Sequence, residues 1–124
     1  MAKKNSLLSV FISFKYAFKG LILMFHGERN FYVHILASVF ALTLAFYFPL
    51  SPAERAIIVI MIALVLAAEI LNSSIERLTD LVQPSFNKKA AEVKDLAAAA
   101  VLVLAIASVA VALIIFLPYI LLIL

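Results

Sequence analysis

Long apolar runs separated by short polar breaks predict four helices along this chain. In residues 6–26 apolar side chains recur every three or four positions, and serine, lysine and glycine fall on the opposite side, which is typical of an amphipathic helix. Lys15 and Lys19 favour a helix that lies in a membrane interface and does not cross the bilayer. Three more strongly apolar segments follow, at residues 31–48, 53–82 and 90–117.

The boundaries of these segments carry recognisable helix signals. Gly27 lies in a polar break and permits backbone conformations that close a helix. Ser51 followed by Pro52 is typical of a helix start, and Pro118 is expected to end or kink the last helix. At a rise of about 1.5 Å per residue, residues 31–48 are just long enough to cross a hydrocarbon core of about 30 Å. The predicted fold is therefore all-α, with one interfacial helix and three transmembrane helices.

Composition places the chain among integral membrane proteins. Of its 124 residues 67% are hydrophobic and only 14% are charged, and the mean hydropathy is +1.20. These values lie far outside the range of soluble domains, and the length suits a single domain over residues 1–124. The chain has no cysteine, which excludes disulfides and thiolate metal sites.

The lysines and arginines predict the orientation in the membrane. Nine of the ten lie before the first span or between the second and third spans, and Arg55 alone lies on the other side. Because cytoplasmic segments carry the excess of positive charge, the N-terminus and the 83–92 loop are expected in the cytoplasm and the C-terminus outside.

The second span ends in a stripe of polar side chains. Thirteen uncharged residues, 56–68, precede it. On a helix the stripe occupies positions i, i+3, i+4, i+7 and i+11, which lie on one face: Glu69, Asn72, Ser73, Glu76 and Asp80. A carboxylate facing lipid costs several kcal/mol, so this face should contact protein or a water-filled cleft.

Further polar groups are expected at the same membrane boundary. Glu28 begins the first span, and Lys94 and Asp95 begin the third. Carboxylates without thiolates favour a hard cation such as Mg²⁺, which usually takes phosphate oxygens as further ligands. His34, inside the first span, is either a partner for a buried carboxylate or a helix contact.

The usual nucleotide motif is absent. The chain has two glycines and no GxxxxGK[ST] segment, which excludes a P-loop, a kinase glycine loop and a dinucleotide fold. Any phosphate bound by this chain would have to be held by Mg²⁺, lysines and helix ends.

Four segments resemble the small prokaryotic diacylglycerol kinase and undecaprenol kinase family. The strongest is AEILNSSIE at residues 68–76, with Asp80 four residues later. The others are ERNFYVH at 28–34, Lys94-Asp95 followed by alanines, and IIFLP at 114–118. The resemblance covers about residues 14–119 and implies a surface helix plus three transmembrane helices, assembled as a homotrimer with active sites shared between subunits.

The resemblance also implies a reaction and roles for individual residues. The γ-phosphate of MgATP would pass to a lipid hydroxyl in the bacterial cytoplasmic membrane, with Glu69 as general base and Asn72 holding the reacting groups. Glu28 and Glu76 would bind Mg²⁺. The remaining nucleotide contacts would come from the first helix, the 83–92 loop and the start of the third span: Tyr16, Ser85, Phe86, Asn87, Lys94 and Asp95.

Two questions stay open at this level. The ERNF segment followed by a histidine resembles the undecaprenol kinase branch, with diacylglycerol as the alternative lipid. A proton or cation pathway and a structural helper of a larger complex are the alternatives that involve no kinase chemistry. A pathway would need polar groups through the full membrane depth, and residues 56–68 supply none.

Overall fold

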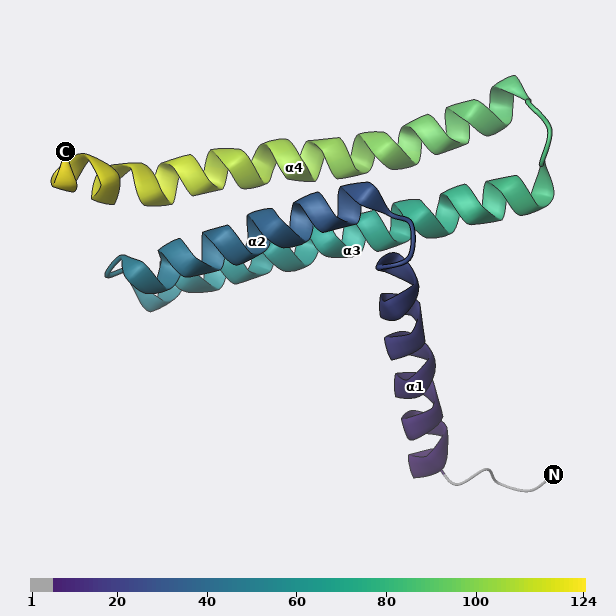
Figure 1. Cartoon of the computed structure of the whole chain (residues 1–124), viewed down its shortest axis with the longest axis horizontal. Helices are drawn as coiled ribbons and strands as arrows, with labels where there is room; N and C mark the ends of the chain where they lie inside the picture. Colours follow the sequence, from purple (N-terminus) through teal and green to yellow (C-terminus); the bar gives the residue numbers. More distant parts are fainter. Residues whose placement is uncertain (1–5) are drawn as a thin grey trace.

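The computed structural model describes residues 6–124, which form four α-helices joined by short loops (Figure 1). The helices are α1 (Ser6–Met24), α2 (Arg29–Tyr47), α3 (Pro52–Val82) and α4 (Lys88–Ile123). The described part of the chain contains no strand, so the prediction of an all-α protein is confirmed.

The helix ends follow from local sequence. At the start of α3 the Ser51 hydroxyl accepts a hydrogen bond from the Glu54 backbone N–H at 3.1 Å, and the Glu54 carboxylate accepts one from the Ser51 N–H at 2.7 Å. This capping box satisfies two N–H groups that the helix leaves free. Gly27, in the break between α1 and α2, has a φ of 110°, a conformation that side chains with a Cβ rarely adopt.

Helix α3 is the centre of the bundle. It packs against both α2 and α4, and the three run alongside one another in alternating directions, whereas α1 stands crosswise to them (Figure 1). Met24, at its last residue, is the one buried side chain of α1. The start of α2, the end of α3 and the start of α4 therefore lie toward the same end of the bundle, as the alternating spans predicted.

The main apolar cluster lies at the opposite end. It joins the α2–α3 turn to the last turns of α4, and its buried members are Ala45, Phe48, Leu50, Ile58, Ile115 and Phe116. Two polar contacts complete it: Arg55 donates to the backbone carbonyl of Ala45 at 3.1 Å, and the Tyr119 hydroxyl donates to Glu54 at 2.9 Å. This end of the bundle is thus tied together, and the polar stripe lies at the other.

Helix α4 continues through Pro118 to Ile123, so the first of the two outcomes expected at Pro118, the end of the helix, is wrong, and a kink there stays a prediction. The Tyr119 ring packs on Phe48, with 5.8 Å between the ring centroids, while its hydroxyl reaches Glu54. Proline removes one backbone hydrogen bond, but unwinding the chain among apolar side chains would leave several backbone groups without partners. The tertiary contacts of Tyr119 therefore favour the continued helix.

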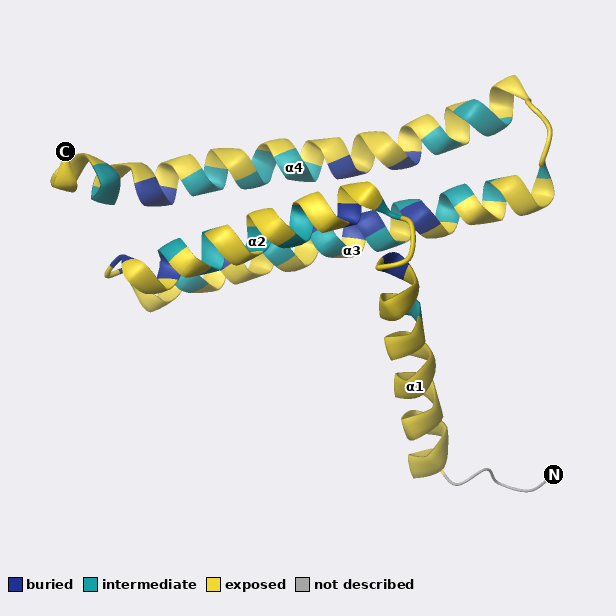
Figure 2. Cartoon of the chain, in the orientation of Figure 1, coloured by how far each residue is buried: buried dark blue, intermediate teal, exposed yellow. Residues whose placement is uncertain are grey.

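The surface of the single chain is mostly apolar. Figure 2 shows exposed residues along the outer faces of all four helices, and large hydrophobic side chains are common among them. All four helices are long and apolar enough to cross a membrane. With 31 residues α3 extends about 46 Å, longer than a hydrocarbon core of about 30 Å, so its last turns would project beyond it.

Candidate active site

The polar stripe of α3 contacts both neighbouring helices. Glu69 and Ser73 are buried, at 6% and 3% exposure, and both face the first turns of α2 and the residue before it. Asp80, two turns further along, faces α4. Each of the three has a partner on another element. The prediction that the stripe faces protein is confirmed for Glu69 and Ser73, whereas the Asp80 side chain is 61% exposed.

Glu69 lies against His34. The Nε2 atom of His34 is 2.9 Å from Oε1 of Glu69, and the imidazole is itself largely covered, with 22% of the side chain exposed. A carboxylate this deeply buried is costly unless a polar group lies beside it. The contact gives His34 the first of its two expected roles, that of partner for a buried carboxylate.

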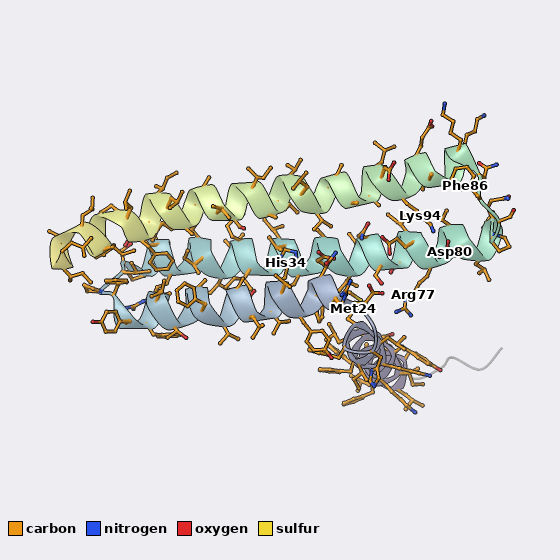
Figure 3. The ribbon with its side chains drawn as sticks, turned by 45° about the horizontal axis from the view of Figure 1, so that its top comes forward. Met24, His34, Arg77, Asp80, Phe86 and Lys94 are labelled. Carbon is orange, nitrogen blue, oxygen red and sulfur yellow. The ribbon has the colours of Figure 1, made fainter. Side chains whose placement is uncertain are left out.

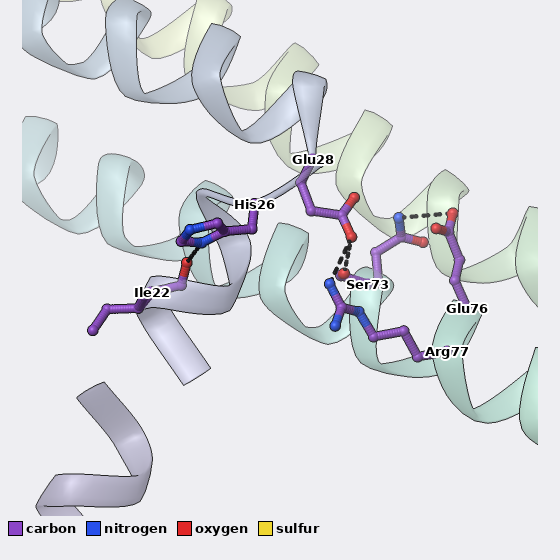
Figure 4. Close-up of polar contacts among 7 residues, drawn as sticks. Ile22, His26, Glu28, Ser73, Glu76 and Arg77 are labelled. Atoms are coloured by element: carbon purple, nitrogen blue, oxygen red, sulfur yellow. Dashed lines mark hydrogen bonds and ion pairs between the residues drawn. The ribbon is translucent and has the colours of Figure 1, made fainter. Parts of the chain in front are cut away.

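Glu28 reaches from the start of α2 to α3 (Figure 4). Its Oε1 accepts a hydrogen bond from Ser73 at 2.6 Å and another from the Arg77 guanidinium at 3.3 Å. Because both contacts use Oε1, the second oxygen remains available for another group. The hydrogen bond from Ser73 and the charge of Arg77 hold the pKa of Glu28 below its ordinary value of 4.5, although partial burial opposes them.

This lowered pKa predicts a pH-dependent stability. An ionised Glu28 stabilises the fold above its unfolded pKa of about 4.5, and the contribution is lost as the pH falls through the lower folded value. In detergent with EDTA, we expect the Tm of the wild type to fall more between about pH 6 and about pH 3.5 than that of Glu28→Gln. Glu92→Gln, which removes an exposed carboxylate of α4, should follow the wild type. Parallel curves for wild type and Glu28→Gln would contradict the prediction.

Asn72 and Glu76 lie on the next turn of the stripe. Asn72 donates a side-chain hydrogen bond to Oε1 of Glu76 at 3.3 Å, while Oδ1 of Asn72 is buried and has no partner in residues 6–124. An orphaned buried oxygen is rare and invites a donor or a cation. Together with Glu28, these residues offer only oxygen atoms, the donor type that Mg²⁺ prefers.

The structure brings most of the predicted nucleotide contacts together at the loop between α3 and α4. Lys94 and Asp80 form an ion pair, and Figure 3 shows both side chains between α3 and α4, with Phe86 toward the loop. These two residues line a cavity of about 140 Å³ together with residues of the loop, among them Ser85, Phe86 and Asn87. Asn87 is also the N-cap of α4 and accepts from the backbone N–H groups of Lys89 and Ala90.

Two predicted residues lie away from this group within one chain. Tyr16 is 65% exposed on α1, and Asp95 is exposed on α4, next to Lys94 but on a different face of the helix. The described residues contain no cluster of three acidic or histidine side chains.

Sequence reasoning did not identify Arg77 as a site residue. Its guanidinium binds Glu28, 49 positions away in the sequence, at 3.3 Å. The available signal was charge: Glu28 and Arg77 lie at the same predicted membrane boundary and have opposite signs.

The part of the chain that carries the candidate site matches a known protein family. A sequence model of the family described as prokaryotic diacylglycerol kinase matches residues 15–116, which contain the whole polar stripe, Glu28 and Lys94. The chain belongs to this family. The match covers well over half of its length.

Individual relatives agree with this assignment. The chain is 37% identical to the undecaprenol kinase of Bacillus subtilis over 115 residues. The aligned residues cover 93% of this chain and 94% of that protein. It is 36% identical over 102 residues to a diacylglycerol kinase of Synechocystis, covering 82% of this chain and 58% of that protein. The diacylglycerol kinase of Escherichia coli K12 is 30% identical over 94 residues, covering 76% and 77%. The expected family resemblance is therefore confirmed, and both of its branches are among the relatives.

Proposed function

We propose that this protein is a lipid kinase that transfers the γ-phosphate of ATP to the hydroxyl group of undecaprenol. The observation that carries the proposal is a buried carboxylate, Glu69, in contact with His34, which lines an apolar groove. Its family and relatives, an undecaprenol kinase and several diacylglycerol kinases, supply the reaction class.

The groove fits a hydrocarbon chain. It has a volume of about 280 Å³ and lies among α2, α3 and α4, with His34 among its lining residues. Ser38 and Ser108 also line it, but their hydroxyls donate to the backbone carbonyls of His34 and Ala105, which leaves the wall effectively apolar. An ion pathway would need polar groups along this depth, so the groove supports a lipid substrate and gives no support to a pathway.

The chemistry assigns one task to each group. Glu69 takes the proton of the lipid hydroxyl while the hydroxyl oxygen forms a bond to the γ-phosphorus of ATP. The bond between that phosphorus and the oxygen that bridges it to the β-phosphate breaks, and ADP leaves with the electron pair. Asn72 holds the reacting groups in place. Lys94 offsets the negative charge of the phosphates once ATP displaces Asp80 from it.

Magnesium fits the residues present. Glu28 and Glu76 would hold the ion, with the buried Asn72 oxygen beside them, and phosphate oxygens and water would complete its shell. A bound Mg²⁺ supplies positive charge against the oxygens of the transferred phosphoryl group.

A homotrimer in the bacterial cytoplasmic membrane completes the proposal. Asp95 and Tyr16 face outward in one chain, where a neighbouring copy would bring such residues to a shared site, and the apolar outer faces suit lipid or other copies. α1 would lie in the interface crosswise to the spanning helices (Figure 1). The N-terminus and the 83–92 loop would be cytoplasmic, as the lysine and arginine distribution indicates.

The lipid assignment rests on the greater identity and fuller coverage of the undecaprenol kinase relative. With purified protein in mixed micelles, labelled MgATP and equal amounts of undecaprenol and diacylglycerol, we expect preferential labelling of undecaprenol and none in EDTA. Preferential labelling of diacylglycerol would reverse the assignment of the lipid. If an assembled protein labelled neither lipid, the kinase proposal itself would fail.

A further inference from the structure

Two carboxylates of the candidate site, Glu69 and Glu28, have very different partners. Arg77 is permanently charged and holds Glu28, whereas Glu69 has an imidazole as its partner. Among the described residues no lysine or arginine forms an ion pair with Glu69. A lysine or arginine in that place would add a fixed positive charge beside the carboxylate, which favours the anionic form and reduces its tendency to accept a proton.

The contact also restricts the position of the carboxylate. A glutamate side chain has several rotatable bonds, while proton transfer needs the base within about 3 Å of the reacting hydroxyl. His34 approaches Oε1 alone, which leaves Oε2 of Glu69 for the substrate. The backbone beneath His34 is held in turn, because Ser38 donates to its carbonyl at 2.6 Å.

His34 further lies where the groove and the carboxylate meet. Among residues 6–124 it is the one ionisable residue that lines the 280 Å³ groove, and its Nε2 contacts Glu69. A hydroxyl group at the end of a chain lying in this groove would reach Glu69 beside the imidazole.

We propose that His34 is a positioning residue for the phosphate transfer, holding Glu69 in the orientation that accepts the proton of the lipid hydroxyl. The inference rests on the proposed lipid kinase function and adds a residue to its machinery. His34 transfers no phosphate and need not change its protonation state, because its task is to hold Oε1.

The geometry allows a test at the level of single atoms. A glutamine side chain places its amide nitrogen near the position of Nε2, whereas an asparagine nitrogen lies near that of Nδ1. Since the contact uses Nε2, His34→Gln should retain kcat to within about tenfold, while His34→Asn and His34→Ala should each lose about 10²-fold, the effect of misplacing a reacting group by about 1 Å. The KM for ATP should stay unchanged in all three.

His26 supplies a matched control. Its ring hydrogen-bonds the backbone carbonyl of Ile22 at 2.8 Å (Figure 4), it lies in the break between α1 and α2, and it does not line the groove. His26→Ala should keep the wild-type kcat. Each variant is compared in the same micelles, with its oligomeric state and Tm measured alongside.

A double variant separates positioning from a general structural role. If His34 acts through Glu69, then His34→Ala should lower kcat no further in a Glu69→Gln background. Additive losses, or equal kcat in the Gln and Asn variants, would overturn the inference even if the wild type is an active lipid kinase. Should His34→Ala fail to assemble, the comparison of Gln with Asn still decides. An inactive wild type would instead refute the proposed function.

Discussion

Replacing Glu69 by glutamine is expected to lower kcat for phosphate transfer by about 10²- to 10⁴-fold, the usual contribution of a general base. Glutamine keeps the size and a polar end, so the buried position against α2 stays filled. It cannot accept the proton of the hydroxyl, and that loss is specific to the reaction. The measurement is the rate of labelled lipid formation at saturating MgATP and undecaprenol.

The size of this effect depends on where Glu69 lies. Three turns of helix before Asp80, it is buried against His34, which lines the apolar groove, and it lies away from bulk water. Water is therefore a poor substitute for the missing base. Glu92→Gln is the matched control, because it removes an exposed carboxylate of α4 and should leave the rate unchanged. An active, correctly assembled Glu69→Gln protein would refute the role of this residue.

Replacing Glu76 by glutamine is expected to lower the rate by at least roughly 10²-fold at ordinary Mg²⁺ concentrations, since removing even a supporting group of a metal site costs about 10- to 100-fold. Glu76 already accepts from Asn72, whose other side-chain atom is the orphaned buried oxygen. With a neutral amide at position 76, Glu28 would be the one remaining negative charge of the two that are proposed to hold Mg²⁺.

A magnesium titration distinguishes this defect from that of Glu69→Gln. In Glu76→Gln the Mg²⁺ concentration for half-maximal rate should rise, and excess Mg²⁺ should restore part of the activity. In Glu69→Gln the half-maximal concentration should match the wild type, because the missing proton acceptor does not bind the ion. If both variants kept the wild-type magnesium dependence, Glu76 would have no part in holding Mg²⁺.

Most of the fold follows from local sequence because a bilayer leaves few alternatives. Backbone groups inside a membrane must find partners within the segment, so a long apolar run with a 3.6-residue period becomes a helix. Ser51 and Pro52 began α3 as expected, and the polar break at Gly27 separates α1 from α2. The predicted end of the last helix at residue 117 was wrong, because the contacts of Tyr119 with Phe48 and Glu54 come from other parts of the chain.

The candidate site was predictable as a set of residues but not as a set of contacts. Helical spacing alone placed Glu69, Asn72 and Glu76 on one face, and the cost of a charge in lipid marked that face as functional. Glu28 meets Ser73 and Arg77 across 45 and 49 residues, and such pairings depend on how far two helices slide and rotate against each other. Helix periodicity carries no information on that register.

By itself, the sequence determined that the chain is a helical membrane protein with a polar stripe at the positively charged end of its spans. Those features depend on the period of the helix and on transfer free energies, which act residue by residue. Only the tertiary structure decided that His34 holds Glu69, that Arg77 holds Glu28 and that Asp80 holds Lys94. These pairs form because three helices pack in one register. For Glu69, burial of the carboxylate is tolerable only beside a partner that the neighbouring helix supplies.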